Sequence, residues 1–256
     1  MVEKYTHLLN KIVGIQSEVQ HLNPALEKLY PVAIVESDQL HVYNFLPMTS
    51  KYCFIKTVSS PMPTPTGLRA AFPLEEYSQQ ITCVVTPEIF KSLEGYITIL
   101  HEFVHCYQYE ICEQRLKMSL DVARRAQETN NHLWEIEYPF PYSALDFIRP
   151  YAAFIASALT CEKANIQSAR KQLKTFLGLH DYEYMVWQEW KEGFARWVEN
   201  QVKGYLRLPT SSKGSKMPFS RVTFYAGGDA LINCLAVDEP SIVKDLPRLF
   251  ARMFIP

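Results

Sequence analysis

The 256-residue sequence lacks the patterns that place a protein in a membrane or a secretory pathway. It has no run of about 18 apolar residues, so no transmembrane helix is expected. The first residues, MVEKYTHLLNKIVGIQ, carry no basic stretch followed by an uninterrupted apolar core, and they predict no signal peptide. We therefore expect a cytoplasmic protein without a membrane partner.

Clustered charge and paired cysteines are also missing. Lysine and arginine number 26 against 27 aspartates and glutamates, and no block of five like charges occurs, which argues against a nucleic-acid partner. The six cysteines show no CxxC spacing and lie mostly in apolar runs, which is typical of buried free thiols. Apolar residues are abundant, at 48% of the sequence, as expected of a globular chain with one core.

The first half of the chain predicts a small sheet. Residues 2–29 have a helical pattern that Gly14 and Pro24 interrupt. Four runs rich in β-branched and aromatic residues then predict strands: YPVAIVES (30–37), QLHVYNFL (39–46), YCFIKTV (52–58) and QITCVVT (80–86). The proline-rich segment 59–73 is expected to be a surface loop near a groove.

From Thr86 the apolar spacing becomes helical and continues through Cys112. Later helices are expected at 119–130, 142–177, 182–206, 226–237 and 240–254, with loops between them that include Gly178. The predicted fold class is α+β, with the sheet first and helices after it. We expect a single domain over 1–256, with an α/β lobe to about 118 and a helical lobe from about 119. The oligomeric state stays open.

The stretch ITILHEFVHCYQYE, residues 97–110, contains an H-E-x-x-H pattern inside the expected helix. Residues four apart share a helix face, so His101 and His105 can bind one metal ion through imidazole nitrogens. Glu102 is displaced by about 100° per residue, which suits a base. In this arrangement zinc lowers the pKa of its bound water toward about 7, and the glutamate accepts the water's proton. The alternative is polar residues that pair with neighbours on a half-exposed helix.

A catalytic zinc ion usually has a third protein ligand. One class of zinc enzymes has glycine three residues after the second histidine and a third histidine three residues later. Here these positions hold Gln108 and Ile111, which excludes that class. Another class takes a glutamate from a later helix, and the segment WQEWKEGFARWVEN, residues 187–200, offers Glu192. The small residues Gly193 and Ala195 would let this helix approach the first one closely.

Together, HEFVH and EGFARWVE resemble the gluzincin metallopeptidases, which bind zinc through two histidines and a glutamate. Several families of this group have a downstream E-G-x-A-x-x-x-E pattern. The resemblance is confined to these two segments and the order of elements. It implies a zincin-like fold, Zn²⁺ held by His101, His105 and Glu192, and hydrolysis of peptide bonds in a peptide or protein substrate.

Other residues have weaker claims. Glu189, one turn before Glu192, is a reserve ligand. On a helical wheel Glu192, Arg196 and Glu199 lie opposite a stripe formed by Trp187, Trp190, Phe194, Trp197, Val198 and Gln201, so a solvated charged face is the alternative reading. Glu199 could accept a hydrogen bond from a metal-bound histidine. Four further candidates lie at expected helix ends or in loops: His132, His180, Glu135 and Glu137.

Tyr225, in TFYAGGDAL, precedes a double glycine that is expected to open a helix, and its hydroxyl could stabilise an oxyanion. Packing is the alternative role for this tyrosine.

Two other functions stay open. A di-iron oxidoreductase would use two E-x-x-H motifs, Glu18 to His21 and Glu102 to His105, but this reading leaves His101 without a role. A catalytically silent interaction module would keep the fold and lose the chemistry, although the intact Glu102 argues against it.

Overall fold

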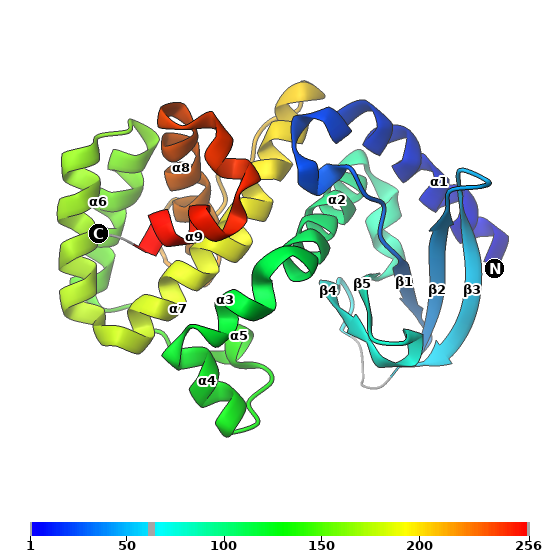
Figure 1. Cartoon of the computed structure of the whole chain (residues 1–256), viewed down its shortest axis with the longest axis horizontal. Helices are drawn as coiled ribbons and strands as arrows, with labels where there is room; N and C mark the ends of the chain where they lie inside the picture. The colour runs from blue at the N-terminus through cyan, green and yellow to red at the C-terminus, as the bar shows by residue number, and fades with distance from the viewer. Residues whose placement is uncertain (1, 61–64, 255–256) are drawn as a thin grey trace. The chain divides into compact units, whose positions relative to one another are not determined.

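The computed structural model describes residues 2–60 and 65–254 (Figure 1). The chain forms two compact units, each described by itself here. The first contains Met1–Glu110 and Gln201–Pro209, and the second contains Ile111–Asn200 and Thr210–Pro256. The fold is α+β, as predicted, with a mixed sheet followed by a mostly helical C-terminal part. The expectation of a single domain stays a prediction.

The first unit contains a five-stranded sheet in the order β3-β2-β1-β5-β4. The bounds are β1 Val32–Glu36, β2 Gln39–Leu46, β3 Lys51–Ser59, β4 Arg69–Leu74 and β5 Gln80–Val85. Only β1 and β5 pair in parallel, and the other neighbours are antiparallel. The four predicted strands correspond to β1, β2, β3 and β5 and are confirmed.

The sequence pattern missed β4, which lies at one edge of the sheet. Its segment, RAAFPL, includes Pro73, which has no backbone N–H to donate to a neighbouring strand. An edge strand tolerates this because one side of it needs no partner. The predicted loop 59–73 is therefore wrong at Ser59, which ends β3, and over residues 69–73, while residues 61–64 lie outside the described residues.

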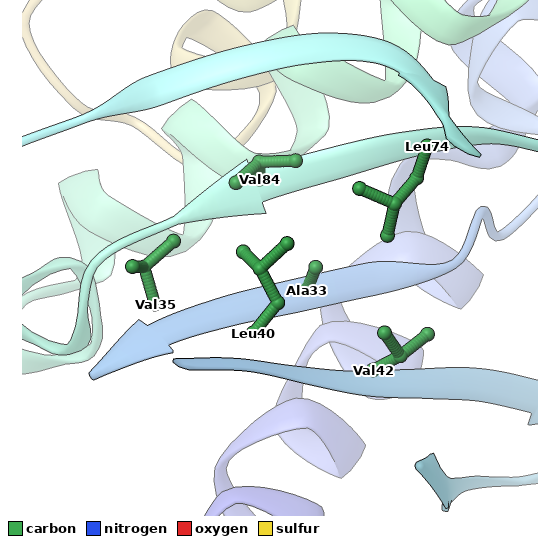
Figure 2. Close-up of a cluster of buried hydrophobic side chains, with 6 residues drawn as sticks. All are labelled: Ala33, Val35, Leu40, Val42, Leu74 and Val84. Atoms are coloured by element: carbon green, nitrogen blue, oxygen red, sulfur yellow. The ribbon is translucent and has the colours of Figure 1, made fainter. Parts of the chain in front are cut away.

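The two faces of this sheet are covered differently. Helix α1, Val2–Val19, passes Gly14 without a break and packs on β3, and the Tyr5 ring lies 6.4 Å from the Tyr43 ring between centroids. Figure 2 shows the apolar cluster of the sheet, which consists of Ala33, Val35, Leu40, Val42, Leu74 and Val84. Partly buried side chains such as Phe72 and Tyr77 pack against this cluster. Successive side chains of a strand point to opposite faces of a sheet, so the strands contribute apolar residues both to the contact with α1 and to the cluster in Figure 2.

Helix α2, Leu93–Gln108, carries the H-E-x-x-H pattern and packs on β4 and β5. It begins later than predicted, because residues Pro87–Lys91 form a 3₁₀ turn and the Ser92 hydroxyl then accepts a hydrogen bond from the Gly95 N–H at 3.1 Å. A π-helical turn, Tyr109–Glu113, follows α2. The helix does continue past Cys112, as predicted, with this wider turn inserted.

The second unit is helical. Its elements are α3 Gln114–Met118, α4 Asp121–Glu128, α5 Trp134–Glu137, α6 Leu145–Leu159, α7 Lys163–Tyr205, whose last residues lie in the first unit, α8 Thr223–Asp238 and α9 Leu246–Phe254. The predicted helix 142–177 is divided between α6 and the start of α7. Gly178, expected in a loop, instead kinks α7 with a φ of 67°, which glycine adopts without strain.

None of the six cysteines, all of which lie in the described part of the chain, forms a disulfide bond, and four of them are buried, in agreement with the sequence analysis. Among the described residues, no helix is both long enough and apolar enough to cross a membrane.

Candidate functional site

In the first unit, one turn of α2 brings three of the predicted site residues together. His101, Glu102 and His105 are each only 6% exposed, so the reading of a half-exposed polar face is wrong. The two imidazole rings lie side by side, with 5.0 Å between their centroids. Burying several polar groups is costly unless each has a partner, and such a cluster is a common feature of a functional site.

Gln108, three residues after His105, contacts the second histidine. Its side chain is fully buried, and its Oε1 lies 2.9 Å from Nδ1 of His105. If Nδ1 carries the proton, the glutamine orients the ring and directs metal binding to Nε2. Gln108 lies three residues after His105, and on a helix this spacing predicts a contact between the two side chains.

Glu102 lies near β5 of the sheet. Burial raises the pKa of the Cys83 thiol on β5 well above its ordinary value, and the negative charge of Glu102 raises it further. Cys83 therefore stays an uncharged thiol beside a buried carboxylate. The Glu102 carboxyl and the Cys83 thiol are thus both buried next to each other.

In the second unit, Glu192 lies on α7 and forms an ion pair with Arg221. Nη1 of Arg221 donates to Oε1 of Glu192 at 3.0 Å and to Oε1 of Gln188 at 3.2 Å. The Glu192 side chain is 12% exposed and that of Arg221 is 32% exposed. The solvated charged face that the helical wheel allowed is therefore wrong for Glu192.

Tyr225 lies in the first turn of α8, close to the same ion pair. The Arg221 guanidinium is 5.6 Å from the centre of the Tyr225 ring, and the Arg196 guanidinium is 5.3 Å from it. Helix α8 begins at Thr223, so the double glycine lies inside the helix and does not open it as expected. Two cations against the ring place Tyr225 in a positively charged environment.

The glycines have a different role from the one predicted. A Cβ atom added to Gly193 would lie 2.5 Å from the Gly228 Cα, and one added to Gly228 would lie 2.1 Å from the Glu189 carbonyl oxygen. The close approach that Gly193 permits is thus between the backbones of α7 and α8. This crossing brings the first turn of α8 near the turn of α7 that carries Glu192.

Glu189, the reserve ligand, is bonded to other side chains in the protein core. Its Oε2 accepts from Arg170 Nη2 at 2.5 Å, its Oε1 accepts from the Tyr151 hydroxyl at 2.7 Å, and the side chain is fully buried. Burial raises the pKa of Glu189, while Arg170 and Tyr151 oppose that rise. Both carboxylate oxygens have partners in the core of the second unit, which favours Glu192 over Glu189 as a ligand.

Two of the remaining candidates, Glu199 and Glu135, form ion pairs with basic side chains. Glu199 lies 3.4 Å from Nε of Arg196, and Glu135 forms ion pairs with Lys117 and Lys191 at 2.6 and 2.9 Å. Three others are exposed or half-buried: His132, Glu137 and His180. In the first unit, Glu18 and His21 of the di-iron reading are both exposed.

Comparison with protein families finds no matching family model, and comparisons with curated proteins and with solved structures find no significant match. The function must therefore be inferred from the side chains described above.

Proposed function

We propose that the protein is a zinc-dependent metallopeptidase of the gluzincin type with a zincin-like fold. The observation that carries the proposal is the buried turn of α2, on which two adjacent imidazoles flank the Glu102 carboxylate. The third ligand in this proposal is Glu192, which the resemblance of EGFARWVE to the gluzincin pattern supplies.

The donor types fit zinc. Two imidazoles and one carboxylate are a common ligand set of catalytic zinc ions and leave a fourth position for water. Gln108 against Nδ1 of His105 is the kind of partner that orients a metal-bound histidine. His105 would then bind through Nε2, and Glu192 would supply a carboxylate oxygen.

When bound, zinc lowers the pKa of a coordinated water to about 7 and polarises a carbonyl group. Glu102 then acts as the general base. Its carboxylate accepts a proton from the water that attacks the peptide carbonyl, and it returns that proton to the amide nitrogen as the C–N bond breaks. The Tyr225 hydroxyl is the proposed donor to the oxygen that becomes negatively charged.

The two alternatives have less support. The di-iron reading needs Glu18 and His21 as buried ligands, yet both side chains are exposed. A silent interaction module has no need for a buried glutamate beside two histidines, because burying a carboxylate costs stability.

The proposal is tested by Glu102→Gln. Because Glu102 moves a proton and holds no metal, the variant should keep close to one zinc per chain. Its hydrolysis of unstructured peptides should fall by roughly 10²- to 10⁴-fold. Zinc is measured by elemental analysis and hydrolysis by mass spectrometry of the products.

Glu94→Gln is the matched control, because Glu94 lies on the same helix but is exposed. Removing zinc from the wild type should lower the melting temperature, since an ion that binds only the folded state stabilises it. Two irons per chain would favour the oxidoreductase, and zinc without peptide hydrolysis would favour the silent module.

A further inference from the structure

Arg221 joins two acceptors on one side of α7. Its Nη1 donates to Glu192 and to Gln188, which lie one turn apart. Gln188 is fully buried, and its Nε2 donates to the backbone carbonyl of Glu135 at 3.2 Å. Gln188, the second acceptor of Arg221, is therefore itself held in place. Arg221, in turn, is fixed relative to α7 by two bonds and by its contact with the Tyr225 ring.

We propose that Arg221 is a positioning residue for Glu192, an inference that rests on the proposed zinc site. The guanidinium holds Oε1 and so limits the orientations of the carboxylate that would bind the metal. A glutamate side chain has several rotatable bonds, and ordering it upon metal binding costs conformational entropy. Arg221 orders the carboxylate before the metal arrives, which strengthens metal binding.

The charge of Arg221 acts in the opposite direction. Arginine remains a cation at every physiological pH, and a cation beside a metal ligand repels the metal. Orientation and repulsion therefore predict opposite effects of removing the guanidinium. Partners of metal ligands commonly contribute 10- to 100-fold to metal affinity, and we assign Arg221 to that class.

The experiment compares the zinc affinity of the full-length wild type with that of Arg221→Ala and Arg221→Lys, by competition with a chromophoric chelator. The dissociation constant should rise roughly 10- to 100-fold in Arg221→Ala. Arg221→Lys should recover only part of the affinity, because a single ammonium group cannot reproduce the planar geometry of a guanidinium.

Arg196→Ala is the matched control. Arg196 contacts the same Tyr225 ring, but its guanidinium pairs with Glu199 at 3.4 Å and donates to Ser211 and to the Lys213 carbonyl, none of which is a proposed zinc ligand. Its removal should leave zinc affinity unchanged. With Co²⁺ in place of zinc, the visible absorption bands report ligand geometry. These bands should change in Arg221→Ala and stay the same in Arg196→Ala, which separates a positioning role from a general loss of packing.

Equal or tighter zinc binding by Arg221→Ala, with one zinc in the wild type, would overturn the positioning role and leave the proposed function standing. A wild type that binds no zinc would overturn both. Melting of the metal-free variants shows whether they fold. If Arg221→Ala is unfolded, Arg221→Lys decides the question by the same two measurements.

Discussion

Glu189 and Glu192 lie one turn apart on α7, and each contacts an arginine of the same unit, yet their surroundings differ. Glu189 is fully buried, and both of its oxygens are bonded, one to Arg170 and one to Tyr151. Glu192 pairs with Arg221, whose side chain is 32% exposed. Two acids one turn apart on the same helix can therefore have different surroundings, which their positions in the sequence motif do not reveal.

Helix geometry explains how neighbours diverge in this way. Three residues turn an α-helix by about 300°, so the two side chains point about 60° apart. This angle is enough for Glu189 to face Tyr151 of α6 and for Glu192 to face Arg221, just before α8. A helical wheel shows the angle but does not show which neighbours occupy each direction.

The largest expected effect is that of Glu189→Ala on stability. The change leaves Arg170 buried without its carboxylate, and breaking a buried ion pair in this way costs about 3–5 kcal/mol of unfolding free energy. Urea denaturation of the metal-free protein measures the loss. Zinc binding per folded chain should persist. A stable Glu189→Ala protein that has lost its zinc would reverse the comparison and make Glu189 the ligand.

Glu192→Ala should affect zinc binding strongly and stability less, which is the reverse of the effects expected for Glu189→Ala. Zinc affinity should fall by more than the roughly 100-fold that loss of an outer partner can cause, because the proposed ligand itself is removed. Hydrolysis should recover partly in excess zinc, since Glu102 remains to activate water. The unfolding free energy of the metal-free protein should fall less than in Glu189→Ala, because Arg221, at 32% exposure, can regain water when its partner is removed.

Zinc affinity is measured by chelator competition and stability by denaturation. Both measurements are made on Glu192→Ala and on Glu189→Ala, so that the two acids can be compared directly. Unchanged zinc affinity in both variants would place the third ligand elsewhere and remove the main support for the gluzincin reading beyond the H-E-x-x-H helix.

A smaller loss of unfolding free energy than in Glu189→Ala is expected when Glu135, a third acid that contacts α7, is changed. Burial raises its pKa, but Lys191 and Lys117 outweigh burial and lower the pKa from 4.5 to about 2. Because the folded-state pKa is depressed, Glu135 contributes its full stability above about pH 4.5 and loses it as the pH falls toward 2.

Glu135→Gln should therefore cost about 1.5–3 kcal/mol at pH 7, the usual loss for hydrogen bonds to charged groups. The difference from the wild type should disappear between pH 4.5 and 2. Denaturation at a series of pH values measures this. A difference that stays constant down to pH 2 would show that the carboxylate charge is not the stabilising feature.

Local sequence patterns predicted which helices and strands form better than they predicted where each one begins and ends. Four strands were correct because alternating β-branched and aromatic residues are a local signal, whereas β4 was missed because Pro73 is tolerated only at a sheet edge. Gly178 was correctly placed at a break, but as a kink within α7. Gly193 was predicted to let its helix approach the H-E-x-x-H helix, but the close approach that the structure shows at Gly193 is to Gly228 of α8.

The sequence by itself determined the α2 turn, because helix geometry places residues three and four apart on one face. His101, Glu102, His105 and Gln108 all follow from that rule. Only the tertiary structure decided the surroundings of the acids on α7. Arg221 lies 29 residues from Glu192 and 33 from Gln188 along the chain, and Tyr151 lies 38 from Glu189. Contacts at such separations depend on where helices cross, and a local pattern of residues does not encode that crossing.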